Sequence, residues 1–523
     1  MSMADLSLWP EEAFNDSLFP DILYQRLGLP NDGSVLVNIV KRSIDARGKK
    51  VTVRFQYDIL KVSEVPSNPD AGTNYQDVRS KKPILIVGSG PAGLFAALRV
   101  IELGYKPIVF ERGKDVQSRR RDLAAINKEH IVNPDSNYCF GEGGAGTYSD
   151  GKLYTRSKKR GDIKRILETF VSHGAKQDIL FDAHPHIGTN KLPKIVAELR
   201  DTIVNHGGEV HFNSRVIDFI ISRDIMEGIV LHSGEKIKGE ALILATGHSA
   251  RDIFHLLQSR NIPIESKPFA LGVRVEHQQN LIDQIQYHCD VDRGPYLPAS
   301  SYALVHQAML KGQARGVFSF CMCPGGFIVP AATAPGEVVV NGMSPSRRDS
   351  VFANSGIVVA VDEKDYSAYK QHGALAGLSF QAEVEHRACA IAGGTQVAPA
   401  QRLVDFVEGR ISNQLLETSY QPGLASVDMK EVLPEFIHQA LRNAFKEFGK
   451  KMKGYFTNDA QIVGVESRTS SPVKIPRDKE TLEHPYIKKL FPCGEGAGYA
   501  GGIVSAAMDG ERCAEAAVRS IKN

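Results

Sequence analysis

The sequence predicts an α/β protein with a small α+β unit in front and an antiparallel α+β region behind. Three observations lead to this prediction. At 523 residues the chain is too long for one ordinary core. Residues 84–110 alternate a buried strand, a glycine-rich turn, a helix and a second strand, which indicates a parallel sheet. From residue 268 onward apolar and polar positions alternate strictly, as in an antiparallel sheet with one covered face.

Composition narrows the functional classes. The chain is 42% hydrophobic and 24% charged, as expected for a globular enzyme, and 63 basic against 60 acidic residues give no reason to expect a nucleic-acid partner. Seven cysteines without a CxxC pair favour reduced thiols in a cytoplasmic protein. No secretory signal stands at the N-terminus, and the longest apolar stretch is interrupted by glycines, so we expect no stable membrane association.

The first 62 residues predict the small α+β domain. Residues 12–29 show helical spacing, and two strands flank the turn signal ARGKK. A basic group lies in this hairpin: Lys41, Arg42, Arg47, Lys49 and Lys50. RNA contact is one interpretation, but a solvated hairpin is favoured because no aromatic stacking residues accompany the charge. Residues 63–80 are polar and aperiodic, which predicts a linker.

The stretch VGSGPAGLFAALRVIELGYKPIVFERG contains a nucleotide-binding fingerprint. Gly88 permits a tight turn, Gly90 lets a pyrophosphate approach the backbone, and Gly93 lets helix and strand pack closely. The helix that starts near Pro91 offers free N–H groups to the phosphates. Glu111 ends the second strand, where its carboxylate can accept ribose hydroxyls and disfavours a 2′-phosphate. These features predict a Rossmann-like dinucleotide site without distinguishing NAD from FAD.

Two later motifs address that choice. ALILATGHS contains an ATG turn after a buried strand, and Arg215-Val216 precedes a strand meander. Near the C-terminus stands FPCGEGAGYAGGIVSAAMDG. Together with the fingerprint, these motifs resemble the FAD-binding branch of the glutathione reductase-like superfamily, in which a distant C-terminal segment completes the flavin site. Glu495 stands where that superfamily usually has Asp, as acceptor for a ribityl hydroxyl. Bare amides at Gly501 and Gly502, before a helix starting near Ile503, would face the flavin.

A more specific resemblance covers nearly the whole chain. GEGGAGTYSDGKLYTR, KRSIDAR, HIGTNKL, SFCMCPGG and GVESRTSSPVKIPRD resemble the bacterial-type FAD-dependent dehydrogenase family of unassigned substrate, which is distantly similar to geranylgeranyl reductases. This resemblance implies an α/β fold with a discontinuous Rossmann-like FAD-binding domain, residues 81–266 and 456–523. Between the two segments it implies an inserted α+β substrate domain, residues 267–455.

The resemblance also implies the residues of the site. Non-covalent FAD would be held by Gly88, Gly90, Pro91, Ala92, Gly93, Glu111, Arg112, Arg119, Gly144, Thr147, Ser149, Asp150, Gly151, Val216, Ala245, Thr246, Gly247, Gly494, Glu495, Gly501, Gly502 and Ile503. Of the arginines after Glu111, one would reach a phosphate and the others would be surface charges. Lys152, Arg468 and His186 are the catalytic candidates, although salt bridges are an equally good interpretation of the two cations.

The cysteines and histidines give weaker signals. Cys321 and Cys323 lie on a predicted strand, on the same face and about 6.6 Å apart, at the limit of disulfide geometry. Sheet packing is favoured over redox chemistry for this pair. His184 and His186 lack companions at metal-ligand spacing, so no metal site is expected.

These observations predict a FAD-dependent oxidoreductase that transfers hydride between flavin N5 and an unidentified small organic substrate. No second GxGxxG follows a strand, so NAD(P)H would bind only transiently as electron donor. Two alternatives remain: a flavin-dependent tRNA-modifying protein, and a non-catalytic protein that FAD stabilises. The sequence does not define the oligomeric state.

Overall fold

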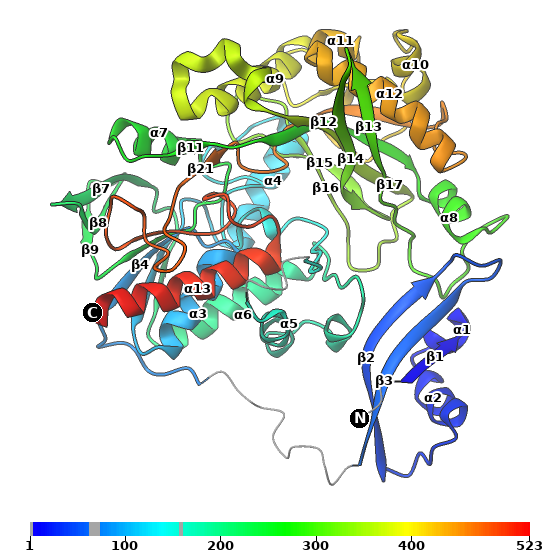
Figure 1. Cartoon of the computed structure of the whole chain (residues 1–523), viewed down its shortest axis with the longest axis horizontal. Coiled ribbons are helices and arrows are strands. Elements are labelled where there is room, and N and C mark those ends of the chain that lie inside the picture. Colours follow the sequence, from blue (N-terminus) through cyan, green and yellow to red (C-terminus); the bar gives the residue numbers. More distant parts are fainter. Residues whose placement is uncertain (1–3, 62–73, 156–160, 523) are drawn as a thin grey trace.

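The computed structural model describes residues 4–61, 74–155 and 161–522. The N-terminal domain is an antiparallel sheet of order β1-β3-β2 packed against two helices (Figure 1). Its bounds are β1 Ala4–Leu8, α1 Pro10–Ala13, α2 Phe19–Leu27, β2 Val35–Asp45 and β3 Thr52–Lys61. Leu8, Ala13, Val53 and Phe55 form its core. The expected linker falls partly on residues 62–73, outside the described residues.

This domain docks through Arg42, which the sequence had placed among solvated charges. The guanidinium of Arg42 bonds Asp182 at 2.7 Å and Asp178 at 3.0 Å. It also lies over the rings of Phe14 and Phe181, 5.2 and 5.1 Å from their centroids. The expectation of a solvated Arg42 is therefore wrong, because this side chain joins the N-terminal domain to the segment 178–183.

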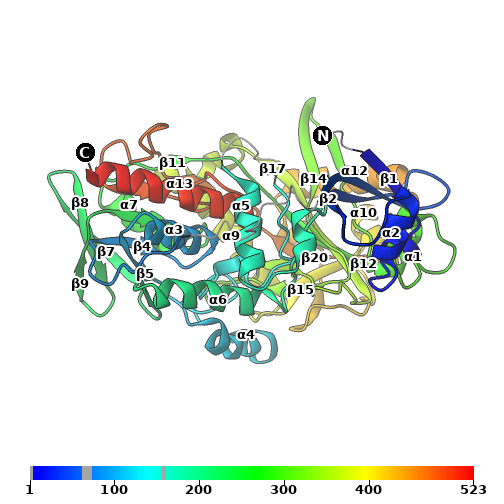
Figure 2. The same ribbon diagram turned by 90° about the horizontal axis from the view of Figure 1, so that it is seen from below.

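The nucleotide-binding domain is built on a parallel sheet of order β22-β10-β4-β5-β6. Its strands are β4 Pro83–Val87, β5 Lys106–Phe110, β6 Glu209–His211, β10 Leu242–Leu244 and β22 Leu490–Pro492. Helices α3 Pro91–Glu102, α5 Ile163–Ser172, α6 Leu192–Asn205 and α13 Ile503–Lys522 cover one face (Figures 1 and 2). The meander of β7 Val216–Ser222, β8 Ile225–Leu231 and β9 Lys236–Lys238 packs on the other face, with α7 Arg251–Ser259.

Side-chain alternation along β4 explains this layering. Ile84 and Ile86 pack into the core under the helices, whereas Leu85 and Val87 pack into the core under the meander. Helix α13 lies directly against α3 (Figure 1). A Cβ at Gly510 would stand 2.1 Å from the carbonyl oxygen of Ala92, so only glycine permits this approach. The chain segment after residue 490 is thus part of the same domain as the fingerprint.

The inserted domain is a seven-stranded mixed sheet of order β13-β14-β17-β12-β20-β18-β19. Its strands are β12 Phe269–Gln278, β13 Val305–Leu310, β14 Gln313–Cys323, β17 Phe352–Val361, β18 Ala398–Arg402, β19 Leu424–Ser426 and β20 Gln461–Glu466. Helices α9 Ala376–Ile391, α10 Leu403–Glu408, α11 Met429–Val432 and α12 Glu435–Lys451 pack against it around an apolar core (Figure 1). Because β20 pairs with β12, this sheet extends past the boundary expected at residue 455.

Shorter elements connect these layers. They are α4 Val116–Glu129, α8 Gln279–Tyr287, the 3-10 segments η2 Gly144–Gly146, η3 Gln177–Leu180 and η4 Glu363–Leu375, and the pairs β11 Glu265–Ser266 with β21 Val473–Lys474 and β15 Phe327–Pro330 with β16 Val340–Met343. Among the described residues, no helix combines the length and apolarity that crossing a membrane requires.

Candidate active site

A cavity of about 400 Å³ opens at the carboxyl ends of β4, β5 and β10. This is the edge at which ligands bind in open parallel sheets. The nucleotide-binding domain supplies most of the wall, including the fingerprint, the 144–152 loop and the start of α13. The inserted domain and its return segment supply Phe320, Cys321, Asn341, Arg468 and Thr469. Both domains therefore face one space.

Glycines shape this cavity in two ways. Gly88 has a φ of 103°, and a Cβ there would stand 2.4 Å from the carbonyl oxygen of Ala245. A Cβ at Gly93 would stand 1.9 Å from the carbonyl oxygen of Gly88. These two glycines permit close packing of strand and helix. Gly90 and Gly501 differ, because a Cβ at either would have no heavy atom within 4 Å and both line the cavity.

Glu111 lies at the end of β5 and is 5% exposed. Its Oε2 accepts hydrogen bonds from the amide and hydroxyl of Ser89 at 3.0 and 2.8 Å. Its Oε1 accepts from the amides of Gly113 and Gly141 at 2.9 and 3.0 Å. The carboxylate thus ties the fingerprint turn to the second glycine-rich loop. A ribose hydroxyl that bonds Glu111 would share oxygens that already accept four protein donors.

The arginines after Glu111 separate into two roles. Arg112 lines the cavity, stacks 4.2 Å from the Phe140 ring centroid and bonds Asp135 at 2.8 Å. Arg119 is fully buried and lies off the cavity wall. Its guanidinium donates to the carbonyl oxygens of Asn137, Glu142 and Gly144 at 2.7, 3.0 and 3.0 Å. Arg119 therefore holds the 141–146 loop in place and is not the surface charge or phosphate contact that was expected.

The polar end of this loop is an ion-pair cluster. Arg348 of the inserted domain bonds Asp150 at 2.6 Å, and Lys152 Nζ lies 3.5 Å from the same carboxylate. Burial alone would raise the pKa of Asp150, but Lys152 and Arg348 outweigh it and lower the pKa to about 2. Lys152 also donates to the carbonyl oxygen of Met322. The cluster joins the two domains beside the cavity.

His186 is off the cavity wall, although its backbone bridges that of Lys152. Its Nε2 lies 3.2 Å from the carbonyl oxygen of Ser346, so that nitrogen carries the proton. Burial and the Arg348 charge lower the pKa of His186 to about 4, and the ring is neutral near pH 7. The suggestion that His186 donates a proton to substrate has no support in this geometry.

The C-terminal motif brings Glu495 to the cavity, where its side chain is partly buried. Burial raises the pKa of Glu495 to about 7. His248, directly after the ATG turn, lies 3.9 Å from Glu495, and burial lowers its pKa to about 3. The amide of Gly501 donates to Ser505 Oγ at 3.2 Å, so this amide, expected to be bare, already has a partner. The N-terminal end of α13 nevertheless faces the cavity.

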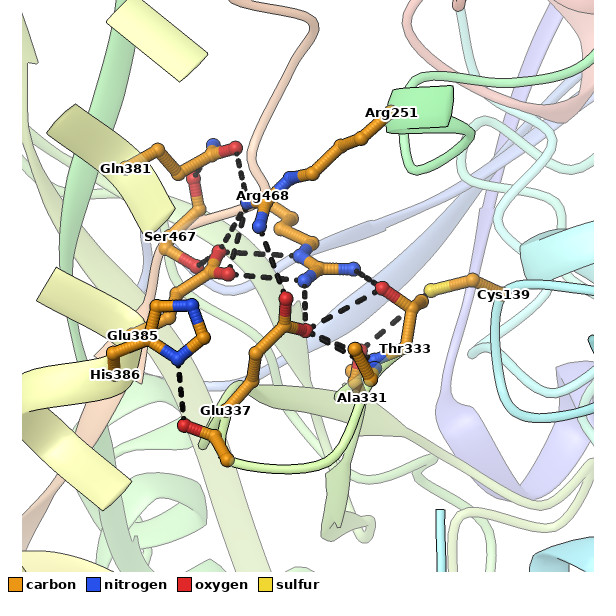
Figure 3. A network of polar contacts seen from close by, with 12 residues as sticks. Cys139, Arg251, Ala331, Thr333, Glu337, Gln381, Glu385, His386, Ser467 and Arg468 are labelled. Atoms are coloured by element: carbon orange, nitrogen blue, oxygen red, sulfur yellow. Dashed lines mark hydrogen bonds and ion pairs between the residues drawn. The ribbon is translucent and has the colours of Figure 1, made fainter. Parts of the chain in front are cut away.

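Arg468 is at the centre of a buried charge network between the domains (Figure 3). Its guanidinium bonds Glu385 at 3.0 Å, Glu337 at 2.7 Å and Thr333 Oγ1 at 2.7 Å. Arg251 of α7 bonds the same two carboxylates at 2.9 and 3.2 Å. With two cations and two anions the network is neutral. Arg468 is therefore committed to protein carboxylates, which disfavours it as the binding group for an anionic substrate.

Most of the predicted site residues lie on the cavity wall. These are Gly88, Gly90, Pro91, Ala92, Glu111, Arg112, Gly144, Ser149, Asp150, Gly151, Lys152, Val216, Ala245, Thr246, Gly247, Arg468, Glu495, Gly501, Gly502 and Ile503. Gly93, Arg119, Thr147, His186 and Gly494 are not among the lining residues. Thr147 instead donates to the carbonyl oxygen of Glu142, and Gly494 to Asp509.

The sequence reading missed several residues of the wall, among them Cys139, Tyr154, His248, Phe320, Cys321 and Asn341. Signals existed for four of them. His248 directly follows the ATG turn, Phe320 and Cys321 belong to SFCMCPGG, and Tyr154 belongs to GEGGAGTYSDGKLYTR. Asn341 had no signal, because only the pairing of β15 with β16 brings it to the cavity.

Three side chains with potential metal-ligand atoms lie close together outside the cavity. Cys493, Asp509 and Cys513 are buried with potential ligand atoms within 4.8 Å of one another. The guanidinium of Arg477 bonds Asp509 at 2.6 Å and approaches the Cys513 sulfur at 3.3 Å. The positive charge in this cluster is thus supplied by arginine.

The parallel sheet and its cavity define a nucleotide-binding class of protein, and a family comparison indicates which nucleotide. Residues 268–469 match the family described as FAD-dependent protein, C-terminal domain-like, and FAD is the cofactor that this match indicates. Residues 2–60 match a domain of unknown function, DUF8436. An uncharacterized protein of Clostridium beijerinckii is 40% identical over 509 residues, 94% of each chain. The chain belongs to the same family as that protein.

Three solved structures show a distant likeness. The flavin-dependent brominase Bmp2 is 13% identical, with 84% and 80% of the chains covered and a TM-score of 0.37. A geranylgeranyl bacteriochlorophyll reductase-like protein of Thermoplasma acidophilum is 12% identical, with 84% and 79% covered and a TM-score of 0.33. Glycine oxidase of Bacillus cereus is 12% identical, with 84% and 95% covered and a TM-score of 0.31. Likeness at this level does not assign a reaction.

Proposed function

We propose that this protein is a FAD-dependent oxidoreductase that transfers hydride between flavin N5 and an organic substrate with an unsaturated bond or an oxidisable C–H. The observation that carries this proposal is the shared cavity. Its wall combines the fingerprint turn at Gly90 with Phe320 and Thr469 from the inserted domain and its return segment. A pocket between a nucleotide domain and a second domain is the usual place for a cofactor and substrate to meet.

The residues of the wall fit non-covalent FAD. The turn before α3 leaves space beside Gly90 for a pyrophosphate, and Gly501 leaves similar space beside the start of α13. Glu495 would accept a ribityl hydroxyl, and its raised pKa lets the carboxyl also donate near neutral pH. Bound FAD would supply two-electron chemistry. The positive end of α13 would stabilise negative charge on the reduced flavin.

Substrate would occupy the side of the cavity formed by the inserted domain. Phe320 gives this side an apolar surface, because the Thr469 hydroxyl is bonded to the Ala270 backbone. After Glu111 the sequence has no second strand followed by GxGxxG. NAD(P)H would therefore serve as a transient donor in the same space, or another reductant would replace it. Competition between NAD(P)H and substrate for one cavity would give ping-pong kinetics.

The test is single-turnover flavin chemistry with the purified holoprotein. After anaerobic photoreduction, reoxidation is followed by flavin absorbance with enones, quinones, imines and oxygen. Phe320→Ala should slow reoxidation by the productive acceptor without lowering FAD content, since Phe320 lies on the inserted side. Phe436→Ala, on α12, is the matched control. A flavin that no reductant reduces and no acceptor class reoxidises would contradict the proposed function.

A further inference from the structure

Two cysteines of the inserted domain place a second redox-capable group at the cavity. Cys321 lies on the cavity wall, and Cys323 is fully buried. The expected extended strand, with thiols about 6.6 Å apart, is wrong. The pairing of β14 with β17 shifts register between Phe320 and Cys323, and Cys321 has a φ of 45°. A non-glycine residue in the left-handed region is uncommon, and such outliers and bulges concentrate at functional sites.

The irregular backbone brings the two thiols together. Cys323 Sγ donates to the carbonyl oxygen of Cys321 at 3.2 Å, and the two side chains lie close enough for each to shift the pKa of the other. Arg274, fully buried, donates to the same carbonyl oxygen at 2.7 Å and approaches Cys323 Sγ at 3.8 Å. Lys152 reaches the intervening carbonyl of Met322 from the opposite domain. Two cations therefore flank the pair.

These contacts divide the pair into a thiolate and a thiol. The interaction with the Cys323 side chain, with the charges of Lys152 and Arg274, lowers the pKa of Cys321 to about 5 although burial opposes the shift. The same side-chain interaction, together with burial, raises the pKa of Cys323. Acidic side chains face the group as well: Asp150, Glu466 and Glu495. An accessible thiolate backed by a buried thiol is the arrangement of an attacking and a resolving cysteine.

We propose that Cys321 and Cys323 form a redox-active pair that exchanges two electrons with FAD bound in the cavity. This proposal rests on the binding of FAD under the proposed function. On oxidation of the pair, an Sγ–Sγ bond forms and the S–H bond of Cys323 breaks. Two electrons and that one proton pass to oxidised FAD, which becomes the anionic reduced form. The reverse step cleaves the disulfide and returns the proton to Cys323. The protein can therefore store two electrons in addition to the two held by the flavin.

The test is an anaerobic dithionite titration of holoprotein that was first oxidised with ferricyanide and desalted. The wild type should take up four electrons per FAD, because a disulfide and a flavin each accept two. Cys321→Ser and Cys323→Ser should each take up two. Cys289→Ser is the control, since Cys289 is a free cysteine outside the cavity, and it should retain four. Peptide mapping of the oxidised wild type should find the Cys321–Cys323 disulfide.

A second measurement works without flavin. In reduced apoprotein, iodoacetamide should alkylate Cys321 with a rate that is half-maximal near pH 5, and Lys152→Met should move that midpoint to higher pH. If the wild-type flavoprotein takes up only two electrons and peptide mapping finds both cysteines unpaired, the redox-active pair is refuted. The proposed function is not affected by that result. Protein that takes up no FAD on reconstitution overturns both. If the buried Cys323→Ser variant misfolds, Cys321→Ser and the peptide map decide the question.

Discussion

Gly501→Val tests whether the cavity receives a flavin. A Cβ at this position would have no heavy atom within 4 Å, and its φ is not in the left-handed region. The ligand-free protein therefore has room for the valine side chain. If the flavin packs against this backbone, the side chain overlaps it. Overpacking costs about 1–3 kcal/mol, which corresponds to a roughly 5- to 150-fold weaker Kd for FAD.

The assay is FAD binding to deflavinated protein, followed by quenching of flavin fluorescence, with far-ultraviolet circular dichroism as the check on folding. Gly48→Val is the control. A Cβ there meets only the Lys50 carbonyl oxygen at 3.7 Å, in the hairpin of the N-terminal domain. Control and wild type should bind FAD alike. If Gly501→Val binds FAD with the wild-type Kd, the open space beside α13 does not hold the flavin, and the account of the C-terminal motif is refuted.

Further predictions concern the ion pairs. Glu385→Gln should destabilise the protein by about 3–5 kcal/mol in denaturant unfolding, because it leaves Arg251 and Arg468 undercompensated in the interior; an unchanged midpoint would contradict the role of the network. Burial alone would raise the pKa of Glu385, but the two arginines lower it from 4.5 to about 2. Because the folded value lies below the unfolded one, this stabilisation is present above pH 4.5 and is lost as pH falls toward 2, and the loss should be smaller in Glu385→Gln. Arg42→Ala should remove about 1–3 kcal/mol of domain docking. The loss should appear as faster hydrogen exchange of the Ala183 amide, which donates to the Arg42 carbonyl oxygen, and equal exchange would show that other contacts hold the domain.

The sequence predicted the parallel sheet and much of the cavity wall because each depends on local rules. The fingerprint has glycines at fixed spacing, and buried strands are recognised by their apolar composition. The strands β4 and β5 and the role of Gly88 could therefore be predicted. The role of Arg119 could not be predicted, because a sequence shows the charge of a side chain but not which carbonyl oxygens will surround it. Cys321 was misplaced for a related reason. Alternation assumes an extended strand, and the register shift in β14 arises from its pairing with β17. Asn341 reaches the cavity only through long-range pairing of the inserted domain.

The contact of α13 with α3 has a consequence for how the protein is made. The fingerprint leaves the ribosome early, whereas the helix that packs on it through Gly510 follows only after the whole inserted domain. At roughly 5–20 residues per second, the about 400 intervening residues take roughly 20–80 s to synthesise. For that period the side of α3 that α13 covers has no partner on the nascent chain, although β4, β5 and α6 already pack on its other sides. The wall of the cavity is therefore completed late in synthesis, since Gly501, Gly502 and Ile503 are among the last residues made.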